Sequence, residues 1–188
     1  MAADNLARDD GTDPDPIVAM IRAGDFRGAV ARSARDHGPA LGRLCIAFLG
    51  VQADAEEAAQ ETFIAAFDAM PGYRGDGAYR AWLYAIARRV CARRVETRVR
   101  REARLRLVRG DETDVPGADV LLATRQRAER VRTALEQLKP SERDAVVLRY
   151  ENDLSFRDVA LACGIDEPAA RKRVSRALER LRESLGDE

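Results

Sequence analysis

Apolar side chains recur along most of this chain at intervals of three and four residues, which places them on one face of a helix. From residue 15 onward the pattern predicts a series of helices. We expect the first ones to be interrupted at Gly24-Asp25, at His37-Gly38-Pro39, at Gly50 and at Pro71-Gly72. No segment shows the apolar-polar alternation that is typical of a half-buried strand. The pattern therefore predicts an all-α protein.

The composition of the connecting segments divides these helices into two groups. Residues 1–14 are small, polar and acidic, which is typical of a disordered tail. The segment after the long helix that ends near residue 106 is also acidic, contains proline and glycine, and has little to bury. We therefore expect two small helical domains, at residues 15–106 and 125–188, joined by a flexible acidic linker at residues 107–124.

The C-terminal part of the chain holds the most specific pattern. Ser155 and Asp158 have the spacing of a capping box, which fixes the start of a short helix. Gly164 permits a tight turn, and an acidic residue at 166 or 167 can cap a second, basic helix from Pro168 to Leu185. This layout is typical of a helix-turn-helix, whose second helix lies in the DNA major groove. The polar face of that helix carries Arg171, Lys172, Ser175 and Arg176.

Two further helix starts are predicted from the same capping chemistry. Asp54 precedes Glu57 by one helical turn, and Ser141 precedes Asp144 in the same way, so we expect Asp54 and Ser141 to be N-caps. A charged helix face is usually only solvated, and spacing alone leaves open whether the face behind Asp54 binds a partner. That face carries Glu57, Gln60, Glu61, Ile64 and Asp68.

Aromatic residues concentrate between Tyr73 and Tyr84, in a glycine-rich loop and the helix after it, and arginines are interleaved with them. Aromatic faces stack on unpaired bases while arginines hold phosphates, so we expect single-stranded nucleic acid to bind here. For Trp82 and its apolar neighbours at helical spacing, packing in the core is the simpler interpretation. The candidate nucleic-acid residues are Arg74, Gly75, Asp76, Gly77, Tyr79, Arg88, Arg89 and Arg93.

The formal net charge of zero is a sum of unlike blocks. Residues 88–109 contain ten arginines and two glutamates, whereas the tail and the expected linker are acidic. Local charge, rather than the total, sets where a polyanion binds. A nucleic acid would therefore bind near the arginine block despite the neutral total.

We find no catalytic motif in the sequence. P-loop, GxSxG and HExxH patterns are absent, and the single histidine, His37, has no clear acidic partner. Cys45, Cys91 and Cys163 lack CxxC spacing and are expected to be buried thiols in a reducing compartment rather than zinc ligands. No apolar run reaches membrane-spanning length. We therefore expect a cytoplasmic protein that is not an enzyme and that has no cofactor, metal site or membrane insertion.

Three sets of segments, in this order, resemble the extracytoplasmic-function (ECF) sigma factors, the small specificity subunits of bacterial RNA polymerase. The similar segments are residues 54–63, residues 73–75 with 81–88, and residues 138–143 with 154–160. The resemblance implies a helical region 2 domain and a helix-turn-helix region 4 domain. It extends over about residues 15–100 and 125–186.

The resemblance also implies a role for each candidate residue. Glu57, Gln60 and Glu61 would dock on the clamp helices of the polymerase β′ subunit, and the β subunit would be a further contact. The glycine-rich loop and the arginines after it would melt and bind the promoter −10 element by capturing an extruded base. The basic C-terminal helix would recognise the −35 element, the linker would extend toward the RNA exit path, and an anti-sigma factor would control the protein.

Two other functions stay open from the residues themselves. A stand-alone helix-turn-helix repressor or activator would use its first domain to sense a ligand or to dimerise, and it would footprint its operator without polymerase. An interaction module that has lost its DNA face would tolerate replacement of Arg171 and Arg176 without losing promoter-directed transcription.

Overall fold

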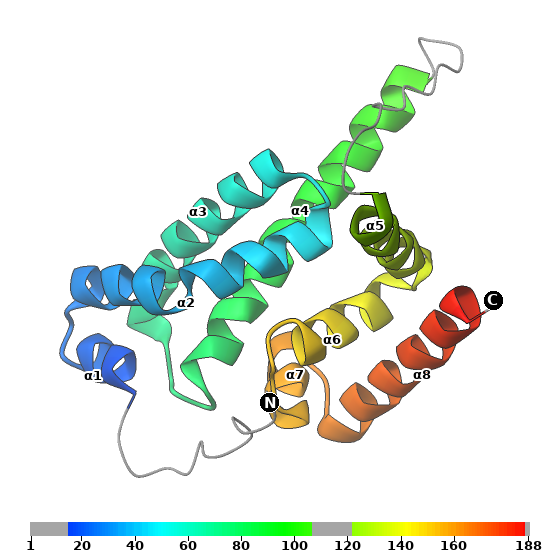
Figure 1. The fold of residues 1–188 in the computed structure, drawn as a ribbon. Helices are drawn as coiled ribbons and strands as arrows, with labels where there is room; N and C mark the ends of the chain where they lie inside the picture. Colours follow the sequence, from blue (N-terminus) through cyan, green and yellow to red (C-terminus); the bar gives the residue numbers. More distant parts are fainter. Residues whose placement is uncertain (1–14, 107–121, 187–188) are drawn as a thin grey trace.

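The computed structural model describes residues 15–106 and 122–186, which form eight α-helices, one 3-10 turn and no strand (Figure 1). The predicted all-α fold class is confirmed. The expected disordered tail at residues 1–14 and all but the last residues of the expected linker lie outside the described residues.

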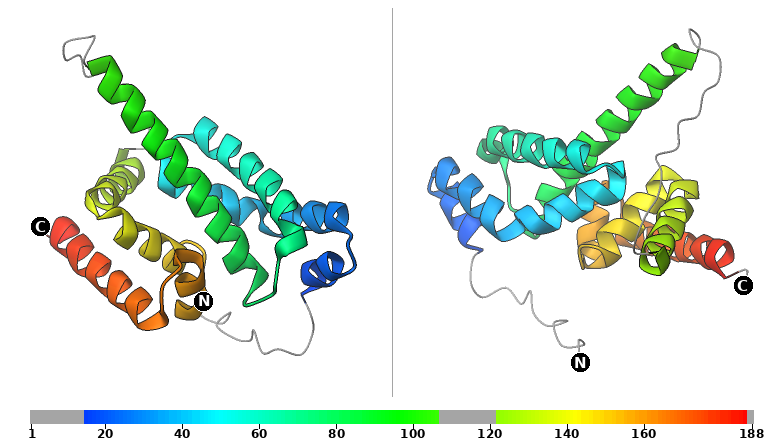
Figure 2. Two further views of the ribbon diagram at one scale, coloured as in Figure 1. Left: turned by 180° about the vertical axis from the view of Figure 1, so that it is seen from behind. Right: turned by 45° about the horizontal axis from the view of Figure 1, so that its top comes forward.

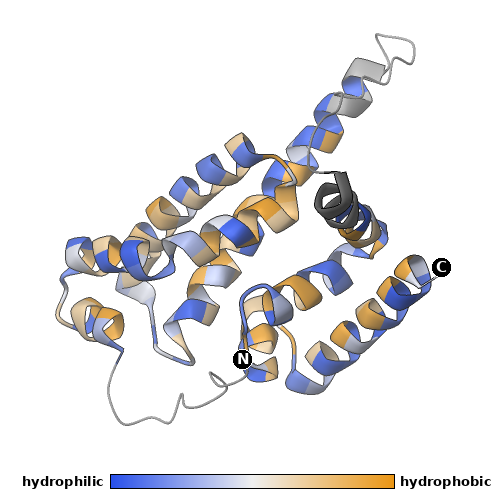
Figure 3. Cartoon of the chain, in the orientation of Figure 1, coloured by the Kyte–Doolittle hydropathy of each residue, from blue (hydrophilic) through white to orange (hydrophobic). Residues whose placement is uncertain are grey.

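Four helices build the N-terminal unit: α1 (Pro16–Arg22), α2 (Phe26–Leu49), α3 (Gln52–Ala69) and α4 (Tyr79–Arg106). The turn η1 (Met70–Gly72) and a loop join α3 to α4. Helices α2, α3 and α4 pack on one another, and α1 packs on α2. The C-terminal part of α4 projects beyond this bundle, and those of its residues that carry a colour in Figure 3 are largely hydrophilic.

The C-terminal unit consists of α5 (Leu122–Gln137), α6 (Pro140–Tyr150), α7 (Phe156–Cys163) and α8 (Glu167–Leu185). Helix α8 packs against α5, α6 and α7. The side of α8 that faces these helices carries small apolar residues that are fully or almost fully buried. These residues are Ala170, Val174 and Ala177.

The two units pack directly against each other. Helix α7 lies beside α4, and α6 approaches α2, so that one contiguous apolar core extends through both units (Figure 2). Arg143 of α6 reinforces the contact by donating hydrogen bonds to the backbone carbonyls of Ala47 and Phe48. These carbonyls lie in the last turn of α2, where the helix leaves acceptors unpaired and a cation is favourable.

Helix α2 is continuous where the sequence predicted a break. Pro39 lies inside it, although proline removes one backbone hydrogen bond of a helix interior. Leu41, Leu44 and Cys45, which follow Pro39, are completely buried. Packing of this segment against α3 and α4 therefore outweighs the local preference for a break. The helix ends as predicted at Gly50, which has a left-handed φ of 75°.

Two of the predicted N-caps are wrong. Helix α3 begins earlier than expected, with Val51 as its N-cap, so Asp54 lies within the first turn. There its charge is favourable to the helix dipole without capping the helix. Helix α6 has Lys139 as its N-cap and Pro140 as its first residue, which leaves Ser141 inside the helix. Proline is well suited to this first position, because its missing N–H would have no partner there.

Candidate nucleic-acid and polymerase interfaces

The loop between η1 and α4 presents an exposed tip. Arg74 and Asp76 form an ion pair at 3.0 Å, and their side chains are 83% and 64% exposed. Gly75 lies between them with a φ of 78°, a left-handed conformation that glycine adopts without strain. The Tyr73 hydroxyl donates to the Gly77 carbonyl at 3.2 Å and closes the loop on itself. The tip therefore offers a cation, an anion and backbone that a ligand could approach.

The aromatic residues around the loop form a packed cluster. Tyr79 is only 1% exposed, and its hydroxyl shares a hydrogen bond of 2.6 Å with Ser33 of α2. Burial raises the pKa of Tyr79 to about 12. The rings of Tyr73 and Trp82 meet edge to face with centroids 4.9 Å apart. Tyr79, which the sequence suggested as a nucleic-acid contact, thus lies in the core and supports the loop from inside.

The three candidate arginines of α4 have different surroundings. Arg88 faces the C-terminal unit, where it pairs with Asp144 at 3.1 Å and donates to the Ala162 carbonyl at 3.2 Å. Arg89 is exposed. Arg93 is also exposed but pairs with Glu61 of α3 at 3.1 Å. The structure therefore does not gather these arginines into one basic patch.

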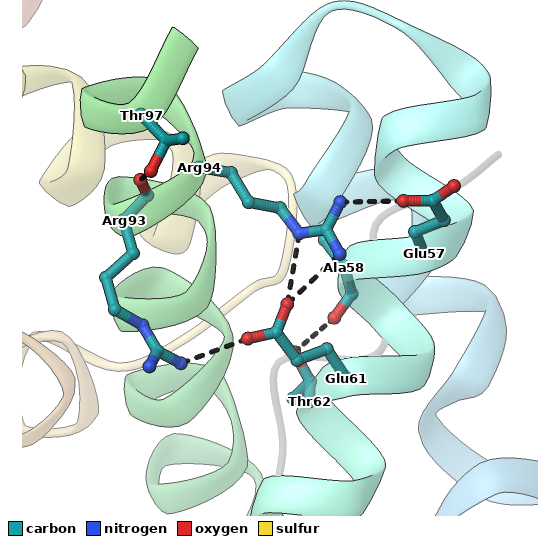
Figure 4. Close-up of polar contacts among 7 residues, drawn as sticks. All are labelled: Glu57, Ala58, Glu61, Thr62, Arg93, Arg94 and Thr97. Atoms are coloured by element: carbon teal, nitrogen blue, oxygen red, sulfur yellow. Dashed lines mark hydrogen bonds and ion pairs between the residues drawn. The ribbon is translucent and has the colours of Figure 1, made fainter. Parts of the chain in front are cut away.

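An ion-pair cluster joins the acidic face of α3 to α4 (Figure 4). The carboxylate of Glu61 accepts hydrogen bonds from Arg93 and Arg94, both at 3.1 Å. Arg94 also donates to Glu57 at 3.0 Å, and this hydrogen bond raises the pKa of Arg94. Gln60 is exposed on the same helix. Two of the three residues suggested for polymerase binding therefore also hold α3 against α4.

Two large apolar side chains of α3 are exposed. Ile64 is 65% exposed and Phe67 is 36% exposed. Apolar side chains in a polar surround are typical of protein-binding surfaces when they are grouped. Ile64 and Phe67, together with the exposed side chains of Glu57 and Gln60, give α3 an outer surface that is partly polar and partly apolar.

Helix α7 covers one side of the loop and the start of α4. The side chain of Leu161 lies so close to Gly77 that it occupies the space of a Cβ at that position. Arg80 of α4 lies 3.9 Å from Asp158 of α7. Together with the Arg88 contacts, these interactions place the helix-turn-helix against the candidate nucleic-acid surface of the N-terminal unit. Sequence reasoning did not foresee this contact, because it depends on how the two units pack.

The helix-turn-helix forms as the sequence predicted. The Ser155 side chain accepts from the backbone N–H of Asp158, and Gly164 ends α7 with a left-handed φ of 67°. Asp166 caps α8 by accepting from the backbone N–H of Ala169 at 2.7 Å. The four candidate DNA contacts of α8 are all exposed, opposite its buried face. They are Arg171, Lys172, Ser175 and Arg176.

No group of three or more histidine, cysteine or acidic residues within residues 15–106 and 122–186 could hold a metal ion. None of the helices there is both long and apolar enough to cross a membrane. Cys45 and Cys91 are buried as predicted, and Cys163 is half-buried. The pKa of the Cys91 thiol is raised by its hydrogen bond with Cys45 and by burial.

Comparison with known families matches both units of the chain. Residues 34–104 match the family described as Sigma-70 region 2, and residues 128–181 match Sigma-70, region 4. The chain is 32% identical to the ECF RNA polymerase sigma factor SigC of Mycobacterium tuberculosis over 72% of each chain. It is 28% identical to the RNA polymerase sigma factor CnrH of Cupriavidus metallidurans, over 90% of this chain and 93% of CnrH.

Solved structures of similar proteins share the fold. CnrH in complex with the cytosolic domain of CnrY superposes with a TM-score of 0.68 at 24% identity, covering 92% of this chain and 97% of CnrH. The sigma factor RpoE of Bartonella quintana in complex with the anti-sigma factor NepR gives 0.64 at 25% identity, covering 87% and 98%. The chain thus belongs to the ECF sigma factors, the transcription initiation factors that direct bacterial RNA polymerase to its promoters.

Proposed function

We propose that the outer surface of α3 binds core polymerase, with Glu57, Gln60 and Glu61 docking on the clamp helices of the β′ subunit. Exposure of Gln60 and of the neighbouring apolar residues Ile64 and Phe67 supports this assignment. Burial of apolar side chains would supply affinity, and the flanking carboxylates would set orientation.

The loop tip and α4 bind the opened −10 element. Arg74, Gly75, Asp76 and Arg89 are exposed and can meet nucleic acid directly. Gly77 and Arg88 are covered by the C-terminal unit, and Arg93 is engaged with Glu61. Gly77 and Arg88 can contribute only after these contacts open, whereas the Arg93 side chain is 67% exposed and can also reach a ligand. The buried Tyr79 keeps the loop in place rather than contacting a base.

Promoter binding therefore requires the two units to separate. The Arg88–Asp144 pair and the Leu161–Gly77 contact hold the helix-turn-helix over the −10 surface. A phosphate and Asp144 cannot both occupy the same edge of the Arg88 guanidinium. The compact arrangement is accordingly a resting form, and binding to core polymerase draws the two units apart along the promoter.

Helix α8 recognises the −35 element. The observation that carries this assignment is the division of α8 into a buried face of small apolar residues and an exposed polar face. Residues near the N-terminus of a recognition helix contact base edges, and the candidate contacts lie in the second and third turns of α8. Arg171 and Arg176 can donate to guanine, and Lys172 and Ser175 can hold base edges or phosphate.

An anti-sigma protein holds this chain inactive in the cytoplasm, where the polymerase acts. The support is by similarity, because CnrH and RpoE of Bartonella quintana were each solved in complex with a protein, CnrY or the anti-sigma factor NepR. Such a partner would act by stabilising the compact arrangement or by covering α3.

Run-off transcription with core polymerase and a genomic promoter library tests the assignment. We expect the wild-type chain to yield promoter-specific transcripts only with core enzyme. The Lys172→Ala/Arg176→Ala variant should lose roughly tenfold or more of the −35-dependent transcripts, since each good base contact is worth about 1–3 kcal/mol. Arg182→Ala, at the far end of α8, is the matched control. A footprint on duplex DNA without polymerase would instead indicate a stand-alone regulator.

A further inference from the structure

Three helices of the C-terminal unit meet at one aromatic ring. Phe156 is the first residue of α7, and its ring lies beneath two guanidinium groups. The Cζ of Arg171 on α8 is 4.4 Å from the ring centroid, and the Cζ of Arg149 on α6 is 5.2 Å from it. Both distances are within the range of a cation–π interaction.

Each of the two arginines has a second contact that fixes its direction. Arg171 also pairs with Glu167, one turn earlier on α8. Arg149 also donates to the Leu154 carbonyl at 3.1 Å. A free arginine side chain samples many rotamers, whereas a guanidinium held at two points keeps one orientation before it meets its ligand.

We propose that Phe156 is a positioning residue for −35 recognition: its ring aims Arg171 at a base edge and Arg149 at a backbone phosphate. The inference rests on the proposed assignment of α8 to the −35 element. Arg171 projects from the exposed face of α8 near its N-terminus, where recognition helices contact bases. Arg149 comes from the end of α6, outside the recognition helix, where phosphate contacts are the rule.

The ring also packs against the core of the C-terminal unit, so its apolar volume and its aromatic face must be tested separately. Phe156→Leu and Phe156→Met keep a large apolar side chain but remove the π face. Phe156→Tyr keeps the face and is the conservative control. Thermal unfolding of each variant shows whether the fold is intact, and Phe156→Met replaces Phe156→Leu if the latter unfolds.

The experiment uses holoenzyme reconstituted with the full chain, on promoters with a randomised −35 element and a constant −10 element. Arg171→Ala should abolish the sequence preference at one −35 base pair. Phe156→Leu should weaken the preference at that same base pair by about two- to fivefold, the size of an exposed cation–π interaction. The Phe156→Leu/Arg171→Ala double variant should be no worse there than Arg171→Ala alone. Phe156→Tyr should keep the wild-type preference. Arg149→Ala should weaken all −35 sequences alike and reduce the salt dependence by about one phosphate contact.

Distinct results separate a failure of this inference from a failure of the proposed function. An unchanged preference in folded Phe156→Leu or Phe156→Met, with Arg171→Ala altered, would overturn the positioning role alone. An equal loss at every −35 position would do the same, because it would indicate a general packing defect. If neither Arg171→Ala nor the Lys172→Ala/Arg176→Ala variant changes −35 preference, the assignment of α8 itself is wrong and the inference falls with it.

Discussion

Arg88 of α4 and Asp144 of α6 form an ion pair at 3.1 Å, and their side chains are only 27% and 20% exposed. The pair joins two units that are separated by the segment 107–121 in the chain. A charge left without its partner in such a half-buried position is unfavourable. The pair therefore helps to fix the compact arrangement while it withholds Arg88 from nucleic acid.

Replacing Asp144 should release Arg88 and loosen the compact arrangement. We expect Asp144→Ala to increase the radius of gyration of the free protein in small-angle X-ray scattering. It should also raise the affinity for a single-stranded −10 oligonucleotide severalfold, as measured by fluorescence anisotropy. Asp36→Ala is the matched control, because it removes the same charge from an exposed ion pair within α2. Equal gains in both variants would mean that net charge alone, rather than opening, causes the effect.

The titration of Asp144 gives a second, pH-dependent prediction. Burial raises the pKa of Asp144 above its usual value, although Arg88 partly opposes the shift. A raised pKa means that the folded chain binds this proton more readily than the unfolded chain. The protonated Asp144 side chain therefore stabilises the fold relative to the ionised one. This stabilisation is fully present below the ordinary aspartate pKa of about 4, and it is lost as the pH rises through the higher pKa that Asp144 has in the folded chain.

Asp144→Asn imitates the protonated form and can still accept from Arg88. We expect this variant to be at least as stable as wild type at pH 7, and the difference to vanish as the pH falls to about 4. Urea unfolding at a series of pH values measures both curves. If Asp144→Asn is instead less stable than wild type at pH 7, and the difference shrinks in acid, the attraction between Arg88 and the Asp144 carboxylate outweighs the cost of burying that carboxylate.

Tyr79 offers a test of whether the aromatic cluster is structural. Tyr79→Phe removes the buried hydroxyl that shares a hydrogen bond with Ser33 and leaves the Ser33 hydroxyl without that partner. Such a loss costs about 1–3 kcal/mol, and denaturant unfolding should show it. The −10 sequence preference of the holoenzyme should not change. Tyr150→Phe, at a position 57% exposed, is the control. If Tyr79→Phe changed the −10 sequence preference and left stability unchanged, Tyr79 would instead be a base contact.

The parts of this fold that the sequence predicted are those fixed by local chemistry. Ser155, Gly164 and Asp166 act on backbone groups within a few residues, and their roles agree with the prediction from spacing. The same spacing gave the wrong N-cap at Asp54 and at Ser141, because α3 and α6 begin earlier than expected. The break expected at Pro39 does not form and Tyr79 is buried, because both outcomes depend on the helices packed around these residues. The sequence around Pro39 signals a break but does not show which helices pack there. The position of Tyr79 beside a glycine-rich loop likewise does not show which helices cover it.

The candidate site shows the same division. The exposed face of α8 was predictable from helical periodicity, because its opposite face had to be buried. The partners of Arg88 and Arg93 were not predictable, since Asp144 and Glu61 come from other helices. An arginine cluster in a sequence gives the charge that is available, and only the fold shows how much of it is already neutralised.

The outer surface of α3 can be divided into residues that hold the fold and residues that do not. Glu61 accepts from two arginines of α4, whereas Gln60 is simply exposed. If this surface binds core polymerase, Gln60→Ala and Glu61→Ala should both reduce co-purification with core enzyme. Only Glu61→Ala should also lower stability, and by no more than about 1 kcal/mol, because ion pairs of partly exposed side chains contribute little.

Pull-down with core enzyme and thermal unfolding, measured on the same preparations, separate the two effects. Asp36→Ala, which removes an exposed acidic side chain from α2, should leave both unchanged. Loss of polymerase binding that tracks loss of stability across the variants would show that the acidic face of α3 is structural. Loss of binding in Gln60→Ala at wild-type stability would place the contact on this surface, since Gln60 lies outside the ion-pair cluster that joins α3 to α4.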